Sequence, residues 1–170
     1  TDWIGIVRAA EQLVALNQPT SQHPLSGMTA LVIGAGGTAR AAAYGLMRSG
    51  ATVTVVNRTH SRAVDLASAL GCQAAGLETT FGAEGNGTTH APTSHPIADI
   101  LVNATSVGLG ELADQMPLPM NAVTRFRFVV DAVYAPSGTP LVRAARQAGI
   151  PVAGGESILL HQGIAQYEYW

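Results

Sequence analysis

Residues 29–59 read TALVIGAGGTARAAAYGLMRSGATVTVVNRT, and their pattern indicates the class of fold. The apolar run at 29–34 ends in glycine and predicts a buried strand. Residues 38–49 predict a helix, and Gly50 follows it at the position where glycine commonly ends helices. Residues 52–56 are β-branched throughout and predict a second strand. The stretch is therefore predicted to be a strand–helix–strand unit of a parallel sheet.

The alternation of strands and helices continues on both sides of this unit. Helices are predicted at residues 2–16, 60–70, 140–148 and 156–169, and strands at residues 99–103, 126–131 and 150–154. Residues 17–27 are expected to form a loop, and residues 78–96, rich in Gly, Thr, Pro and His, a long mobile surface loop. The alternation predicts an α/β fold: a Rossmann-type, doubly wound parallel sheet in three α/β/α layers, with about six strands.

Composition excludes several classes of protein. The 170 residues fit one domain, and 47% hydrophobic against 12% charged residues is the reverse of what a disordered chain needs. The net charge is −2 without a basic stripe, so no nucleic-acid partner is expected, and no apolar run reaches the roughly 18 residues of a membrane span. Cys72 is the single cysteine, which predicts a reducing, cytoplasmic location. The five histidines show no metal-ligand spacing, so no metal is predicted.

The glycine-rich turn after the first strand of the unit is a candidate phosphate site. Gly34 permits a tight turn, Gly36 lets the backbone approach a pyrophosphate, and Ala39 is small enough for close helix–strand packing. The helix that follows directs its free N–H groups at the phosphates. The segment Gly34, Ala35, Gly36, Gly37, Thr38 and Ala39 is therefore predicted to bind a dinucleotide. The alternative is a glycine turn in an α/β protein that holds no nucleotide.

The end of the second strand indicates which dinucleotide binds. An NAD-binding domain usually has Asp or Glu there to bind the ribose 2′-hydroxyl, but here the position is Asn57. Arg58 and Arg62 follow, and guanidinium groups grip phosphate in a planar fork, while Thr59 adds a hydrogen-bonding side chain. These residues predict NADP rather than NAD. The alternative is two solvated arginines at a helix start, where the helix dipole disfavours them.

Six segments in order resemble the shikimate dehydrogenase family (shikimate/quinate 5-dehydrogenase). They are TDWIGI at the start, VIGAGGTARAA (32–42), VNRTHSRA (56–63), NATSVGL (103–109), DAVYAPSGTPL (131–141) and GGESILLHQGIAQYEYW at the end. The resemblance covers nearly the whole chain, but only the second, NADP-binding half of such an enzyme. It implies that residues 1–170 are a single cofactor domain, with a substrate domain upstream. A multifunctional aromatic-pathway protein is one parent that fits.

The resemblance also implies which residues hold the cofactor. Asn57, Arg58, Thr59 and Arg62 match the clamp on the 2′-phosphate. Asn103, Ala104, Thr105, Ser106, Ala132 and Gly155 match positions beside the nicotinamide. The family often has Met at the position of Ala132, so this site departs from the pattern and leaves more room there.

Three further positions match residues on the substrate side. Asp2 matches the aspartate that partners a catalytic lysine and binds substrate, and Tyr134 and Gln162 match substrate-binding residues. Without the resemblance, Asp2 would be interpreted as a helix cap, Tyr134 as a packed aromatic residue and Gln162 as a surface residue.

The implied reaction is the reversible NADPH-dependent reduction of 3-dehydroshikimate to shikimate, in aromatic amino acid (chorismate) biosynthesis. All nine basic residues are arginine and there is no lysine. The chain alone is therefore expected to bind NADP(H) but to lack dehydrogenase activity. Two alternatives stay open: a quinate/shikimate dehydrogenase with relaxed substrate choice, and a non-catalytic pathway repressor or sensor that keeps the fold.

Overall fold

A parallel six-stranded sheet forms the centre of the computed structural model, which describes residues 2–18, 22–82 and 96–168. The strands are β1 (Thr29–Ile33), β2 (Thr52–Asn57), β3 (Gln73–Gly76), β4 (Ala98–Asn103), β5 (Phe126–Asp131) and β6 (Val152–Ala153). Their order is β3-β2-β1-β4-β5-β6, and every neighbouring pair is parallel. This is the doubly wound order in which the direction of winding reverses between β1 and β4. The predicted fold class is confirmed.

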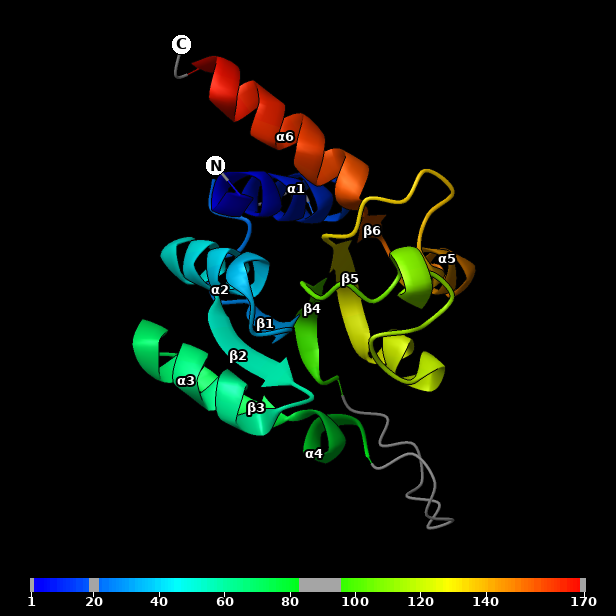
Figure 1. Cartoon of the computed structure of the whole chain (residues 1–170). Helices are drawn as coiled ribbons and strands as arrows, with labels where there is room; N and C mark the ends of the chain where they lie inside the picture. Colours follow the sequence, from blue (N-terminus) through cyan, green and yellow to red (C-terminus); the bar gives the residue numbers. More distant parts are fainter. Residues whose placement is uncertain (1, 19–21, 83–95, 169–170) are drawn as a thin grey trace.

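Helices cover both faces of the sheet. The α-helices are α1 (Asp2–Asn17), α2 (Gly37–Arg48), α3 (His60–Leu70), α4 (Leu77–Phe81), α5 (Pro140–Gln147) and α6 (Gly155–Glu168). Two short 3₁₀ helices, η1 (Gly110–Leu112) and η2 (Met120–Arg125), lie between β4 and β5. Figure 1 shows α6 lying over α1, so that α6 packs mainly on another helix and not on the sheet.

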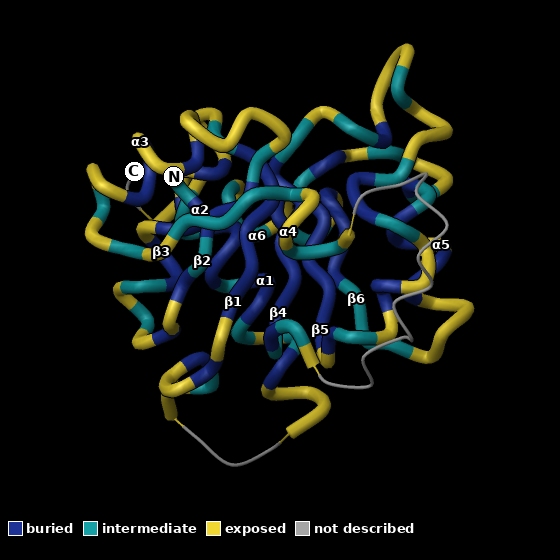
Figure 2. The backbone as a smooth tube through the Cα atoms, turned by 90° about the horizontal axis from the view of Figure 1, so that it is seen from below, coloured by how far each residue is buried: buried dark blue, intermediate teal, exposed yellow. Residues whose placement is uncertain are grey.

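The core is divided by the alternation of side chains along the strands. Val32, Val55 and Val102 face the cluster that includes buried residues of α1, α2 and α3, whereas Leu31 and Leu101 face the cluster formed with α5 and η2. Figure 2 shows the buried strands at the centre, with exposed turns around them. Buried on both faces, these strands are apolar nearly throughout, which is typical of parallel sheets.

Between β2 and β4 the structure differs from the sequence-based expectations. Residues 78–81, expected to belong to a loop, lie in α4, and β3 was not predicted at all. Strand β3 has the sequence QAAG, without a β-branched residue, and its place depends on pairing with β2. The remainder of the predicted loop, residues 83–95, lies outside the described residues. The last predicted strand, 150–154, shortens to β6.

No helix in the described part of the chain is long and apolar enough to cross a membrane.

Candidate functional site

The glycine turn lies where β1 ends, at the point of the sheet where the winding reverses. Gly34 has a φ of +122°, which L side chains rarely adopt, and its N–H donates to the Val56 carbonyl oxygen at 2.8 Å. A Cβ on Gly34 would stand 2.7 Å from the carbonyl oxygen of Ala104, in the loop after β4. The turn therefore requires glycine at 34 because the backbone of a neighbouring loop passes directly against it.

The beginning of α2 is open toward this edge of the sheet. Gly36 is the N-cap and forms no side-chain cap, so the first N–H groups of α2 have no side-chain acceptor. A Cβ placed on Gly36 or Gly37 would meet no atom within 4 Å. Open space in front of uncapped helix amides is a fit for the pyrophosphate of a dinucleotide. Ala39, in contrast, is fully buried against the core.

A cavity of about 340 Å³ continues from the end of β2 to the loop after β4. The predicted phosphate clamp, Asn57, Arg58, Thr59 and Arg62, lines one side together with Ile33 and Leu77, and Thr105, Ser106 and Val107 line another. The lining is completed by Leu112, Gln115, Met116 and Pro117. The fold thus brings two segments that are far apart in sequence, both predicted to bind cofactor, to one cavity.

The clamp is electropositive because of its two arginines. Arg58 and Arg62 are exposed, and within the described ranges neither forms an ion pair with a carboxylate. The Asn57 amide donates to the Thr59 carbonyl oxygen at 3.0 Å, which fixes the turn from β2 into α3. Two unneutralised guanidiniums beside a cavity are suited to a phosphate monoester.

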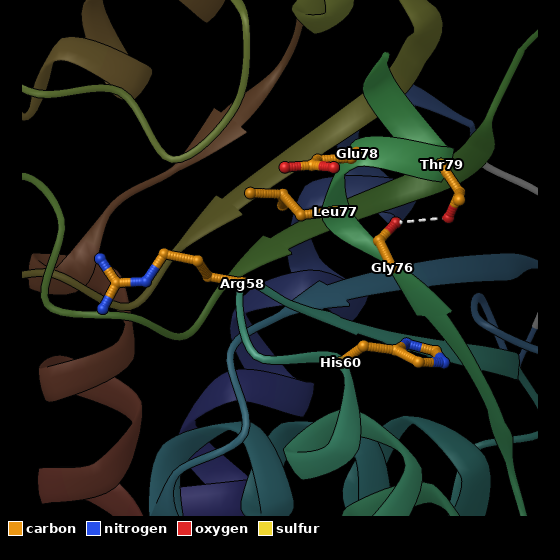
Figure 3. Close-up of a pocket in the computed structure, with 6 residues that line it drawn as sticks. All are labelled: Arg58, His60, Gly76, Leu77, Glu78 and Thr79. Carbon is orange, nitrogen blue, oxygen red and sulfur yellow. Dashed lines mark hydrogen bonds between the residues drawn. The ribbon is translucent and has the colours of Figure 1, made fainter. Parts of the chain in front are cut away.

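Arg58 also lines a neighbouring cavity of about 380 Å³, drawn in Figure 3. Its other lining residues are His60, Gly76, Leu77, Glu78 and Thr79. The side chains of Arg58 and His60 point to opposite sides, so His60 is not part of the clamp in this arrangement. Glu78 is exposed, and it lies on α4, the helix that the sequence did not predict.

The residues predicted beside the nicotinamide gather where β4, β5 and α6 meet. The Ala132 N–H donates to the Asn103 carbonyl oxygen at 2.9 Å, which joins the ends of β4 and β5. A Cβ on Gly155 would stand 2.5 Å from the backbone nitrogen of Tyr134, so only glycine lets α6 begin this close to that loop. The Tyr134 side chain is half exposed and available to a ligand.

Asp2 and Gln162, predicted on the substrate side, are neighbours although they are 160 positions apart. The Gln162 side-chain amide donates to a carboxylate oxygen of Asp2 at 3.3 Å. Helices α1 and α6 approach closely because Gly5 has no side chain: a Cβ there would lie 2.8 Å from the Ile158 carbonyl oxygen. Asp2 is the first residue of α1, so the structure places it inside the first turn and not at the N-cap position. Its negative charge is still favourable at this end of the helix dipole.

Comparison with known proteins identifies relatives of this arrangement. The profile of a family described as shikimate / quinate 5-dehydrogenase matches residues 16–81. The shikimate dehydrogenase (NADP(+)) of Halorubrum lacusprofundi is 44% identical over 146 residues, covering 86% of this chain and 49% of the relative. The crystal structure of shikimate 5-dehydrogenase from Thermus thermophilus, in complex with NADP(H) and shikimate, is 34% identical. It superposes with a TM-score of 0.72 over 99% of this chain and 55% of that one.

The chain belongs to the shikimate dehydrogenase family. It spans about half the length of the Halorubrum relative. A bifunctional 3-dehydroquinate dehydratase/shikimate dehydrogenase of Arabidopsis thaliana is 34% identical over 174 residues. The match covers 27% of the length of that protein. Members of this family therefore occur both in shorter chains and joined to another enzyme.

Several residues at this family site were not foreseen from the sequence. Leu112, Gln115, Met116 and Pro117 line the cavity that holds the clamp, but they lie in an irregular segment whose path no local pattern predicts. Asp131 belongs to the segment 131–141 that resembles the family, but the sequence predicted no role for it. It is fully buried at the edge of the sheet that carries the site. Asn103 is also fully buried, and its side chain is used in contacts within the protein. Its carbonyl oxygen accepts from the Ala132 N–H as well, so the structure offers no free surface of Asn103 for the predicted cofactor contact.

The described residues contain no group of three or more His, Cys, Asp or Glu side chains that could hold a metal ion.

Proposed function

We propose that this chain is the NADP(H)-binding domain of an NADP-dependent shikimate dehydrogenase. The observation that carries the proposal is the cavity at the end of β2. There, Arg58 and Arg62 have no carboxylate partner among the residues that the structure describes, and Asn57 replaces the acidic residue expected for NAD. A dianionic 2′-phosphate would gain charge-assisted hydrogen bonds from both guanidiniums. The open start of α2 would receive the pyrophosphate.

The reaction proposed for the whole protein is the reversible reduction of 3-dehydroshikimate to shikimate, in aromatic amino acid (chorismate) biosynthesis. The nicotinamide cofactor supplies the hydride when bound. The part of this chain is to bind and orient: Ala104, Ala132 and Gly155 border the nicotinamide end, and Tyr134, Asp2 and Gln162 face the substrate side. The hydrogen bond between Gln162 and Asp2 orients both side chains before substrate arrives.

The proposal includes a second domain, upstream in sequence, that completes the active site. The chain covers only 49% of the Halorubrum relative and 55% of the Thermus one, so the relatives contain about as much chain again. Helix α6 carries exposed apolar side chains, at Leu159, Leu160, Ile164 and Tyr167, which a further domain would cover. Because this chain contains no lysine, a lysine that exchanges a proton with substrate would have to come from that domain. We therefore expect the isolated chain to bind NADPH but not to reduce 3-dehydroshikimate.

The experiment that tests the cofactor assignment is a calorimetric titration of this chain with NADPH and with NADH. We expect NADPH to bind at least tenfold more tightly, a difference of about 1.4 kcal/mol. The double variant Arg58→Ala/Arg62→Ala should remove this preference by weakening NADPH alone, since NADH has no 2′-phosphate. Arg48→Ala is the matched control, because Arg48 is an exposed arginine at the far end of α2, where it contacts Tyr44. Equal binding of the two cofactors by the wild type would refute the assignment.

A further inference from the structure

Three polar residues are buried at the edge of the sheet that carries the candidate site. Asn103 ends β4, Asp131 ends β5, and Thr139 is the N-cap of α5. In the part of the chain that the structure describes, they are the only polar or charged residues that are buried. Asn103 and Asp131 are directly opposite each other in the parallel pairing of β4 and β5. Burying polar groups is costly unless they are hydrogen-bonded, so their contacts explain how the fold tolerates them.

The Asp131 carboxylate collects hydrogen bonds from three separate segments. Its Oδ1 accepts from the Asn103 side-chain amide at 2.9 Å and from the Val133 backbone N–H at 3.1 Å. Its Oδ2 accepts from the Thr139 hydroxyl, and the Thr139 Oγ1 in turn accepts from the Val142 N–H at 3.1 Å. One side chain thus connects the end of β4, the loop after β5 and the first turn of α5.

Asn103 extends the same network into the loop after β4. Its Oδ1 accepts from the Thr105 hydroxyl at 2.7 Å and from the Thr105 N–H at 3.2 Å, and its Nδ2 also donates to the Val107 carbonyl oxygen at 3.3 Å. The Asp131 carboxylate can only accept hydrogen bonds, so it orients the Asn103 amide with its nitrogen toward Asp131 and its oxygen toward Thr105. The position of the loop that carries Ser106 into the cavity therefore depends on Asp131 as well.

Electrostatics does not favour a carboxylate at this position. The three donors to Asp131 are neutral groups, and the charged side chain that acts on it is Glu156, of the same sign. Burial, the largest effect, and the charge of Glu156 together raise the pKa of the Asp131 carboxyl by more than the three hydrogen bonds lower it. A buried charge without a cation costs stability, so the segments that the Asp131 hydrogen bonds hold in place are the more relevant feature.

We propose that Asp131 is a positioning residue for the dinucleotide, holding loops 104–109 and 132–139 where they flank its nicotinamide end. The proposal rests on the proposed function, because it assumes that a dinucleotide binds at this edge. The two loops carry Ala104, Ala132 and Tyr134, and the start of α6 at Gly155 packs directly against the second of them. Loss of the hydrogen bonds to the Asp131 carboxylate would therefore shift both loops that flank the nicotinamide, while leaving the 2′-phosphate clamp in place.

The test compares Asp131→Asn with Asp99→Asn in the 170-residue chain. Asp99 is a matched control, because its carboxylate also receives three hydrogen bonds, from the Thr29 N–H, the Thr29 hydroxyl and Arg127, but at the opposite, amino-terminal edge of the sheet. NADPH is titrated by calorimetry, and exchange of the Val133 and Thr105 amide hydrogens is measured without cofactor. We expect Asp131→Asn to weaken NADPH binding at least about tenfold and Asp99→Asn to change it less than about twofold. The Val133 and Thr105 amides should exchange faster only in Asp131→Asn.

Equal NADPH affinity of Asp131→Asn and the wild type would overturn the proposal, as would equal losses in both variants, which would indicate a general loss of stability. If Asp131→Asn does not fold, Thr139→Ser and Thr139→Val test the proposal in its place. Thr139→Ser keeps the hydroxyl donor and should bind NADPH like the wild type. Thr139→Val lacks this donor and should bind NADPH more weakly. A wild-type chain that binds no NADPH would overturn the proposed function. Faster exchange confined to Asp131→Asn would then show that the network itself orders the loops.

Discussion

Two glycines in the same turn, Gly34 and Gly36, are predicted to respond in opposite ways to alanine. At Gly34 the φ of +122° is unfavourable for any L side chain, and an added Cβ would be 2.7 Å from the Ala104 carbonyl oxygen and 3.0 Å from its carbon. Both atoms belong to backbone, so neither can rotate away. Backbone strain of about 1–3 kcal/mol and a similar overpacking cost add to about 2–6 kcal/mol. That is a large part of the about 5–15 kcal/mol that stabilises an ordinary domain.

Gly36→Ala should leave stability almost unchanged but weaken NADPH binding. Gly36 has φ −92° and ψ −167°, which alanine adopts freely, and its Cβ would meet no protein atom within 4 Å. Loss of the glycine N-cap costs about 1 kcal/mol, and the reduced entropy of the unfolded chain offsets about 0.4–1 kcal/mol of it. The net change in the free energy of unfolding is therefore within about 1 kcal/mol. The new methyl group would stand where the pyrophosphate approaches.

Urea denaturation measures the stability of the two variants, and calorimetric titration measures their affinity for NADPH. We expect Gly34→Ala to lower the urea midpoint strongly, and Gly36→Ala to keep the midpoint while losing at least about tenfold in NADPH affinity. A Gly34→Ala variant as stable as the wild type would refute the argument from close backbone approach. Unchanged NADPH affinity in Gly36→Ala would refute the assignment of the turn to a pyrophosphate.

Three other variants test separate parts of the structure. Gly5→Ala should destabilise the chain by up to about 2 kcal/mol in urea denaturation. Its Cβ would lie 2.8 Å from the Ile158 carbonyl oxygen, an overpacking cost of about 1–3 kcal/mol, and the gain in helix propensity offsets only about 1 kcal/mol of it. Asp99→Asn should lower the free energy of unfolding by about 1 kcal/mol near pH 7, measured by the same method. This difference from the wild type should disappear as the pH falls below about 4. The reason is that the folded-state pKa of Asp99 is lowered, so Asp99 stabilises the fold only in its ionised form. Leu160→Arg should leave stability within about 0.5 kcal/mol and reduce self-association in sedimentation, since Leu160 is 63% exposed on the apolar face of α6.

Much of the fold was predictable because its signals are local. The strand–helix–strand unit at 29–57 and helix α3 at 60–70 lie within a residue or two of their predicted limits, since apolar runs, β-branched residues and closing glycines identify them without tertiary information. Strand β3 was not predictable in this way. Its QAAG sequence has no strand preference of its own, and it becomes a strand through register with β2, where Ala75 pairs with Val56.

In the candidate site, too, the parts with local sequence signals were predictable and the parts that depend on tertiary structure were not. The glycine turn and the arginines that follow β2 are short motifs next to strand ends, and the cavity gathers the arginines where the sequence predicted a phosphate. The opposite wall includes Leu112 and Met116, which reach the cavity only because the segment after β4 folds back toward α4. No spacing in the sequence encodes that return, so these contacts required the structure.

The pKa values of the carboxylates at the two edges of the sheet are shifted in opposite directions, and this difference supports the proposed location of the site. Partial burial raises the pKa of Asp99, but hydrogen bonds from Thr29 and Arg127 and the charge of Arg127 outweigh it, so the pKa is lowered and ionised Asp99 stabilises the fold above about pH 4. Burial dominates at Asp131 and raises its pKa, so its contribution is favourable below about pH 4 and is lost as the pH rises through the raised value. At neutral pH Asp131 therefore costs stability where Asp99 adds it. A fold keeps such a cost where a site needs it, and the edge that carries Asp131 is also the edge where the glycine turn, the clamp and both loops converge.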